Sequence, residues 1–319
     1  MKNVFYKALV ILFLSTQYSI LFIHAAKAQT DTSGSSIFTA SPTFNKPRLT
    51  FVAGTGSALY LSAFSGLYVL WYKDYPQSPF HLYNDNAEWL QMDKVGHFYT
   101  SYYIGKIAID VLGWTGLERK KSILYGAGTG LLFQTTIEVM DGFSSGWGFS
   151  IGDMTANTLG SALVTAQALL WNEQRIQPRL SVHSTKYAGY RPEVLGSNVY
   201  ERIFKDYNGQ TLWLSGNISS FLSKESTFPK WLNLAAGYGI DGVVGGFYNQ
   251  TVNKKGIPIP NFVRQRQFYL SLDIDLSRIK TKSKFLKTVF TTVGFLKVPM
   301  PALEWNSKTG GLKFYPLYF

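Results

Sequence analysis

The sequence of 319 residues contains no cysteine. Disulfide bonds within this sequence, a thiol nucleophile and a metal site built from thiolates are therefore excluded. A cysteine that could carry a lipid is missing as well from the cleavage site described below. Histidine is scarce, with four residues, of which His24, His81 and His183 stand apart from other candidate ligands. Any imidazole chemistry therefore depends mainly on His97.

Residues 1–28 predict a secretory signal peptide that is cleaved before Gln29. Lys2 and Lys7 make the start positive, residues 8–23 form an apolar stretch, and an Ala-Lys-Ala motif follows. The alternative is a retained first transmembrane helix. Polar residues within the apolar stretch, together with the cleavage motif, favour removal. We therefore expect an exported protein of the bacterial cell envelope.

Acidic residues are in deficit only in the second half of the chain. Residues 29–180 carry 10 lysines and arginines against 11 acidic residues, whereas residues 181–319 carry 18 against 8. On an exported protein, this excess predicts an anionic partner such as membrane lipid or lipopolysaccharide, with other envelope proteins as a further class. Export argues against nucleic acid as the partner. Basic side chains that simply solvate strands are the alternative explanation.

Long runs without charge predict a bundle of about four apolar helices over residues 49–175, after a flexible leader over 29–48. The helices are predicted at 49–72, 93–113, 119–140 and 153–171; the first carries no charge at all, and charge is absent from 122–137 in the third and from 154–172 at the fourth. The first run is long enough to cross a bilayer, and Gly54 and Gly56 within it would allow close contact with another helix. A buried helix of a globular bundle is the alternative.

Residues 176–319 predict a basic, strand-rich region. Polar and apolar residues alternate over 179–184, 211–218, 231–240 and 267–276, as in antiparallel strands. Residues 280–297 predict a basic amphipathic helix that could lie on a membrane or cap a sheet. The fold class is therefore α+β, with an apolar bundle of about four helices followed by an antiparallel β-sheet region.

The chain ends on an aromatic strand over residues 311–319. A final strand that closes on phenylalanine, here Phe319, resembles the terminal strand of bacterial outer-membrane proteins. Pro316 cannot donate one of the ladder hydrogen bonds, so this strand is predicted at the edge of its sheet.

Polar residues gather at the ends of the predicted helices, where an apolar bundle would make isolated charges costly. They sit four or three apart, so that members of each pair share a helix face. Antiparallel packing would bring all these helix ends together at one end of the bundle. The residues concerned are Asp93, Lys94, His97, Glu138, Asp141, Asp153 and Asn157.

Three roles are open for this cluster. His97 could act as general base or nucleophile, with Asp93, Glu138 or Asp153 as the carboxylate that orients it. A divalent cation could instead be held by His97 and carboxylates; the candidate ligands are His97, Glu138, Asp141 and Asp153. In the structural alternative, Lys94 and His97 neutralise the acids and fix the helix ends, with Asn157 as a further polar member.

The same residues carry a resemblance to known families. The pattern Asp-Lys-x-x-His of residues 93–97, with the stretch from Glu138 to Asn157, resembles the YfiM-like family of predicted periplasmic proteins, a domain of unknown function. More distantly it resembles VanZ-like membrane proteins. Those proteins carry Glu-x-x-x-Gln on the third helix, whereas this chain has the reverse order, Gln134 before Glu138. The resemblance implies an envelope protein with a shared polar site.

Two functional hypotheses follow. The first is a structural or assembly factor associated with the outer membrane, based on the aromatic terminal strand and the basic half. The second is a membrane-embedded enzyme acting on a lipid or cell-wall precursor through the His97 and acidic cluster. Lys106 and Asp110 interrupt the second helix, which favours the outer membrane or its periplasmic face over the inner membrane.

Overall fold

The computed structural model describes residues 39–73 and 75–319. The predicted signal peptide and residues 29–38 of the predicted leader lie outside this range. The chain divides into two compact units. The helical unit comprises the described residues up to Asn84 together with His97–Glu173, and the sheet unit comprises Asp85–Gly96 and Gln174–Phe319.

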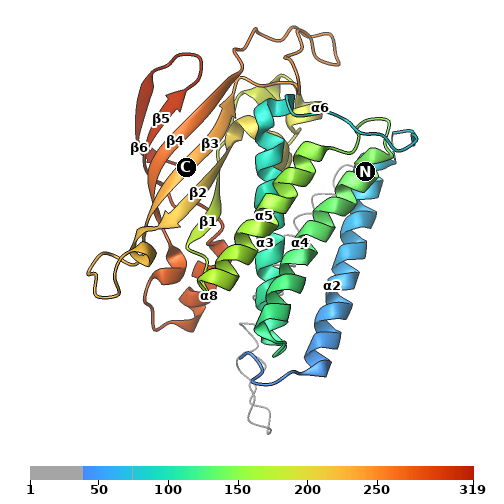
Figure 1. The fold of residues 1–319 in the computed structure, drawn as a ribbon. Helices are drawn as coiled ribbons and strands as arrows, with labels where there is room; N and C mark the ends of the chain where they lie inside the picture. The colour runs from blue at the N-terminus through green and yellow to red at the C-terminus, as the bar shows by residue number, and fades with distance from the viewer. Residues whose placement is uncertain (1–38, 74) are drawn as a thin grey trace. The chain divides into compact units, whose positions relative to one another are not determined.

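The helical unit is the predicted bundle of four long helices, which run side by side in Figure 1. They are α2 (Lys46–Leu67, continued by a π-helical turn over Tyr68–Tyr72), α3 (Met92–Trp114), α4 (Arg119–Gly142) and α5 (Ile151–Leu170). Helix α2 begins three residues before the predicted run because Asn45 caps it, its side-chain oxygen accepting from the Arg48 N–H at 3.0 Å. Among the described residues, no helix has both the length and the apolar character needed to cross a membrane.

Helix α3 packs against α4 and α5 through glycines. A methyl group at Gly126 would overlap the backbone nitrogen of Ile109, and one at Gly130 would overlap the carbonyl oxygen of Ser101. Gly160 of α5 lies equally close to the carbonyl oxygen of Phe98. The close contact predicted for α2 is wrong, because Gly54 and Gly56 have no atom within 4 Å of an added methyl group. The small residues that allow helices to touch are therefore on α4 and α5.

A left-handed turn leads into α3. Trp89, Leu90 and Gln91 have φ values of 47°, 50° and 66°, a conformation that costs a non-glycine residue roughly 1–2 kcal/mol. Contacts within the sheet unit hold it: Trp89 N–H donates to the Gly246 carbonyl at 3.0 Å, and Gln91 accepts from Arg266 at 2.6 Å. The turn is thus fixed by tertiary hydrogen bonds that the local sequence does not reveal.

The sheet unit contains six antiparallel strands in simple sequence order, β1 to β6. They are β1 (Ile176–Val182), β2 (Gln210–Asn217), β3 (Leu232–Asp241), β4 (Gln265–Ile274), β5 (Met300–Asn306) and β6 (Leu312–Tyr318). The predicted antiparallel sheet is confirmed, and β6 lies at an edge as Pro316 indicated. Strand β5 was not predicted, although its residues alternate between buried and exposed positions.

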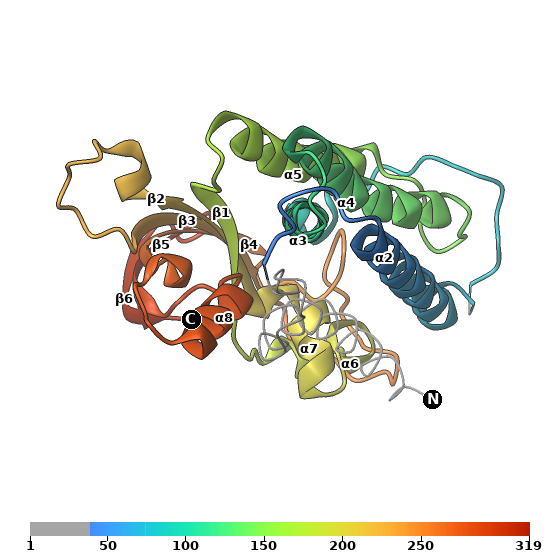
Figure 2. The ribbon, with the colours of Figure 1, turned by 90° about the horizontal axis from the view of Figure 1, so that it is seen from below.

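Short helices complete the sheet unit. They are α6 (Pro192–Leu195), α7 (Val199–Lys205) and α8 (Lys284–Val293), the last within the predicted amphipathic helix. Seen from below, the strands curve around α8 (Figure 2). The chain after α8 runs along the free edge of β1, where Lys297 N–H donates to the Leu180 carbonyl at 2.9 Å. The basic helix therefore belongs to the sheet's inner side.

The sheet has an inner face and an outer face, because side chains alternate along each strand. The inner face is buried and holds Trp213, Tyr269 and Tyr318 packed together. Beside this aromatic cluster it also buries polar and charged side chains. These include Arg179, Ser181, Thr211, Ser215, Asn217, Asn233, Ser271, Asp273, Glu304 and Asn306.

The outer face consists of the side chains on the opposite side of strands β2 to β6. It is exposed and apolar. Its large members are Leu214, Leu234, Phe268, Leu270, Leu272, Leu303, Trp305, Leu312 and Phe314, with exposed fractions from 38% to 77%. Antiparallel sheets of water-soluble proteins place apolar side chains inward and polar ones outward, so this sheet has the inverted arrangement.

Candidate functional site

Three helices of the helical unit bring one polar cluster together. His97 comes from α3, Glu138 from α4, and Asp153 and Asn157 from α5. Glu138, Asp153 and Asn157 are at most 3% exposed. Four of the residues singled out in the sequence are therefore neighbours inside the bundle, even though 60 residues separate His97 from Asn157.

The surroundings of His97 favour one tautomer. Its Nδ1 lies 3.1 Å from the Asn157 side-chain oxygen and 3.6 Å from a Glu138 carboxylate oxygen, and both oxygens can accept a hydrogen from Nδ1–H. The Gln134 amide, 3.1 Å from Nδ1, can instead donate to the same Asn157 oxygen at 3.3 Å. We assign the ring proton to Nδ1. Nε2 of the neutral ring is then an acceptor, the arrangement that histidines use as bases and as metal ligands.

Glu138 has a strongly raised pKa. Burial raises its pKa to about 8, and the nearby Asp153 adds to the increase, whereas His97 opposes it. One carboxylate oxygen accepts from the Ser150 N–H at 3.1 Å. The same Ser150 caps α5, because its hydroxyl oxygen accepts from the Asp153 N–H at 3.1 Å. Glu138 therefore also ties α4 to the start of α5.

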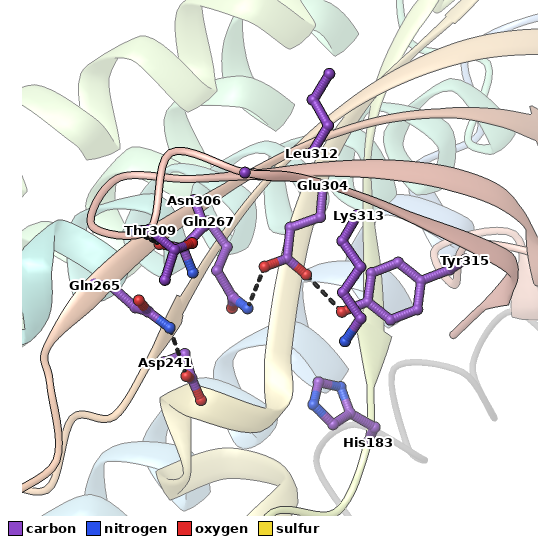
Figure 3. A pocket seen from close by; sticks show the side chains of 11 residues that line it. His183, Asp241, Gln265, Gln267, Glu304, Asn306, Thr309, Leu312, Lys313 and Tyr315 are labelled. Carbon is purple, nitrogen blue, oxygen red and sulfur yellow. Dashed lines mark hydrogen bonds between the residues drawn. The ribbon is translucent and has the colours of Figure 1, made fainter.

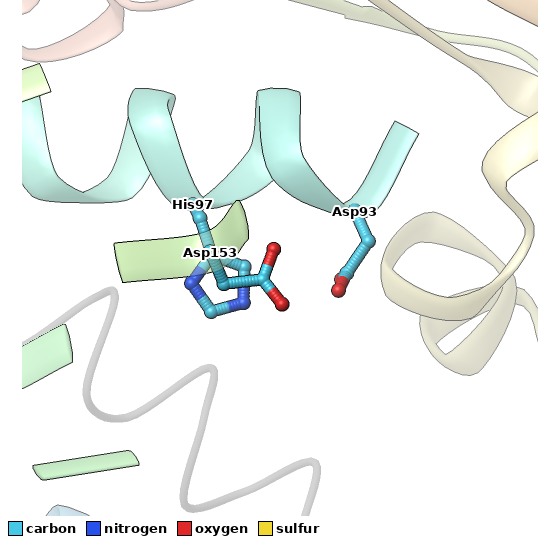
Figure 4. A group of neighbouring side chains, drawn as sticks. All are labelled: Asp93, His97 and Asp153. Carbon is cyan, nitrogen blue, oxygen red and sulfur yellow. The ribbon is translucent and has the colours of Figure 1, made fainter. Parts of the chain in front are cut away.

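Asp153 is the second acid near His97. A nitrogen of His97 and an oxygen of Asp153 lie within 4.8 Å of each other, and Figure 4 shows the two side chains adjacent. Asp93 is one turn before His97 on α3, so helix geometry places it on the same helix face. Imidazole and carboxylate oxygen are ligands that suit zinc and other divalent cations, so this pair meets the minimum chemistry of a cation site.

The remaining predicted members have hydrogen-bond or ion-pair partners outside this cluster. Lys94 pairs with Asp85 at 2.7 Å within the sheet unit, and Asp93 accepts from the Tyr207 hydroxyl at 2.7 Å. Asp141 accepts from the Tyr72 hydroxyl at 2.7 Å. Asp141 still acts on the cluster through its charge, since it contributes to the raised pKa of Glu138.

A second layer of hydroxyls supports the cluster. Ser101 of α3 donates to the Asn157 carbonyl at 2.8 Å and lies 2.9 Å from the Ser161 hydroxyl, which contacts the Ala127 carbonyl at 3.1 Å. The sequence reasoning did not include these serines. Ser101 lies four residues after His97, a spacing that could have placed it on the same face.

The sheet unit contains a separate polar cleft of about 440 Å³. Figure 3 shows Asp241, Glu304 and Tyr315 from three strands around it, with His183 at one side. Glu304 accepts from Gln267 at 3.0 Å and from the Tyr315 hydroxyl at 2.6 Å. Burial lowers the pKa of His183, against the attraction of Asp206 and Asp241. The carboxylates here are satisfied by neighbouring side chains, which identifies the cleft as an extension of the inner face.

Comparison with known proteins supports a location in the cell envelope. Residues 82–170 match the model of a family described as a predicted periplasmic lipoprotein (DUF2279). This stretch contains the whole His97 cluster. No curated protein and no solved structure matches the chain. The match supports a cell-envelope protein similar to an uncharacterised periplasmic family, in agreement with the expected export.

Proposed function

We propose that the protein is a structural or assembly factor of the cell envelope that works at the outer membrane or on its periplasmic face. The observation that carries the proposal is the inverted sheet, whose outer face is apolar while its inner face holds the charges. A chain with this pattern needs an apolar neighbour. The similarity to a periplasmic family and the excess of basic residues in 181–319 support the same location.

Separation of inner and outer membranes from cells tests this location. We expect the mature chain in the outer-membrane fraction, where it should stay after a carbonate wash, because apolar attachment does not depend on salt bridges. A periplasmic protein released by the same wash serves as control. Recovery in the inner-membrane fraction would contradict the location, and release into the wash would contradict apolar attachment.

The second candidate function is that of an enzyme acting on a lipid or cell-wall precursor through the His97 cluster. The pKa of Glu138, raised to about 8 beside His97, favours this candidate, because perturbed pairs of this kind concentrate at active sites. In that role, Nε2 of His97 would take the proton, and Asn157 and Glu138 would hold the ring through Nδ1. A divalent cation held by His97 and Asp153 is compatible with the same geometry.

The substitution Glu138→Gln should change how stability depends on pH. The folded chain keeps the Glu138 proton up to a pKa of about 8, whereas an ordinary carboxyl loses it near 4.5. The free energy of unfolding therefore falls as pH rises between these values and levels off above them. Glutamine has no proton to lose, so the variant should match the wild type near pH 4.5 and exceed it by a few kcal/mol above pH 8, since each pKa unit corresponds to about 1.4 kcal/mol. Thermal melts across this range measure the difference.

The same thermal melts with added Mg²⁺, Ca²⁺ or Zn²⁺ distinguish a cation-binding role of the cluster from a purely structural one. A cation held by His97 and Asp153 should stabilise both the wild type and Glu138→Gln, whereas one that also binds the Glu138 carboxylate should stabilise the wild type most above pH 8 and the variant less. A pH slope without any response to the three ions would assign the cluster a structural role. If wild type and variant have the same slope, the raised pKa is wrong.

A further inference from the structure

We propose that the outer face of the sheet is the docking surface for the acyl chains of an anionic phospholipid bilayer. The inference rests on the proposed envelope function and names the surface and the ligand that would carry it out. It uses only the sheet unit, and it does not depend on the chemistry of the His97 cluster.

The centre of the outer face is continuous across five strands. Leu234 pairs with Leu272, and Leu270 stands between Ala236 and Leu303 in the register of β3, β4 and β5. Leu234 and Leu270 are 48% and 49% exposed. No outward position from Leu214 to Phe314 in this register carries a charged residue except Arg266, at the start of β4. A contiguous apolar surface of this extent is unfavourable in water at about 25 cal/mol per Å² and requires a cover.

The opposite face excludes the simplest alternative, a sheet that is merely exposed on both sides. Arg179, Asp273 and Asp275 are buried together on the inner side, with nitrogen–oxygen distances of 3.5–3.6 Å. If water surrounds the sheet, this arrangement has two free-energy costs: the buried charges lose their hydration, and the exposed leucines are in contact with water. The pattern becomes favourable when the medium outside is hydrocarbon.

The ends of the strands indicate lipid and not protein as that medium. The β3–β4 connection (242–264) and the β5–β6 turn (307–311) contain Lys254, Lys255, Arg264 and Lys308 and no acidic residue. At the other end, the β2–β3 connection and residues 276–283 contain five basic residues and one acidic residue, Glu225; the basic residues are Lys224, Lys230, Arg278, Lys280 and Lys282. Basic side chains thus flank the apolar surface at both ends, where anionic headgroups would lie.

Aromatic side chains occur at the same two ends. Phe221 and Trp231 are 53% and 40% exposed in the β2–β3 connection, and Phe247 and Tyr248 are 45% and 67% exposed in the β3–β4 connection. The amphipathic rings of Trp231 and Tyr248, one at each end, favour the boundary between hydrocarbon and headgroups, and the two phenylalanines add apolar surface beside them. The basic side chains therefore correspond to the headgroup layer, the aromatic rings to the boundary, and the apolar surface to the hydrocarbon layer of a bilayer.

Flotation with lipid vesicles tests the surface. The full exported chain should float with vesicles of phosphatidylethanolamine and phosphatidylglycerol and less with phosphatidylcholine alone. The double variant Leu234→Asp/Leu270→Asp should reduce the bound fraction about tenfold or more, since two carboxylates would face hydrocarbon. The control Thr50→Glu/Ser57→Glu adds the same charge at exposed positions of α2, in the helical unit, and should bind within about threefold of the wild type.

A second readout covers the case in which the double variant does not fold. Trp305 is 44% exposed on the outer face and is one of eight tryptophans. Lipids brominated on their acyl chains should quench the fluorescence of the wild type, and Trp305→Phe should remove a large part of that quenching. Unchanged quenching in Trp305→Phe would place the outer face away from the acyl chains and overturn the inference.

The outcomes separate this inference from the proposed function. If the folded double variant floats like the wild type, the docking surface is wrong while membrane attachment stands. If the wild type fractionates with cell membranes but does not float with pure lipid, the partner is a protein and the lipid inference fails. A wild-type dimer in lipid-free buffer that Leu234→Asp/Leu270→Asp dissociates would assign the face to a second copy. Failure of both fractionation and flotation would overturn both proposals.

Discussion

Replacing Gly130 by alanine should destabilise the helical unit by about 3 kcal/mol, the upper range for forcing a methyl group into a packed contact. The added methyl group would overlap the carbonyl oxygen of Ser101 and approach the backbone of Gly105. Backbone atoms cannot rotate away as a side chain can, so α3 and α4 must separate. The same displacement would move Ser101 from Asn157 and loosen the His97 cluster, because Ser101 bonds to Asn157 at 2.8 Å.

Gly128 provides the matched control on the same helix. It has no atom within 4 Å of an added methyl group, so Gly128→Ala should stabilise the protein by up to about 1 kcal/mol through helix propensity. Chemical denaturation of both variants, followed by circular dichroism, measures the two free energies of unfolding. Equal effects of Gly128→Ala and Gly130→Ala would refute the close contact of α3 and α4.

Replacing Arg179 by methionine should destabilise the sheet unit by about 3–5 kcal/mol, the usual result of removing one partner from a buried ion pair. Arg179 lies 3.6 Å from Asp273 and 3.5 Å from Asp275, and the side chains of all three are at most 2% exposed. Methionine fills a similar volume but cannot neutralise either acid. Asp273 would retain its 2.6 Å hydrogen bond from Ser215, and Asp275 its 3.3 Å pair with Arg278, so the loss should be partial.

The solvent-exposed pair of Lys106 and Asp110 is the control for this charge loss. It has a similar separation, 3.1 Å, but Asp110 is 67% exposed, so Lys106→Met should change stability by less than about 1 kcal/mol. The double variant Arg179→Met/Asp273→Asn should recover part of the lost stability because one unpaired charge is removed with its partner. If Arg179→Met costs no more than Lys106→Met, the inner face is hydrated and the inverted arrangement of the sheet is wrong.

The helices were predictable because their signals are local. Predominantly apolar runs placed α3, α4 and α5 to within two residues at each end, and alternation placed four of the six strands. Strand β5 was not predicted because Pro301 stands near its start and a predicted basic helix precedes it, so its alternation was not recognised. The left-handed turn at Trp89 also gave no signal, since hydrogen bonds from residues far along the chain hold it.

The residues of the candidate site could be predicted from the sequence, but the contacts between them could not. Spacing placed Asp93 with His97 and Asp153 with Asn157 on common helix faces. It could not show that Lys94 turns to Asp85 or that Asp141 binds Tyr72, because those partners lie on loops and on another helix. Gln134 became part of the site only when α4 packed beside α3.

The sequence by itself determined the α+β order of elements and the identity of the polar residues, since both depend on composition and short-range periodicity; its signal peptide stays a prediction. Only the tertiary structure decided which face of each strand is buried. Alternation shows that two faces differ, but not which of them faces outward, because both assignments have the same period. The strands curve around α8 (Figure 2), and Arg179, Asp273 and Lys297 are buried, so the side that carries these charges became the interior and the leucines were left outside.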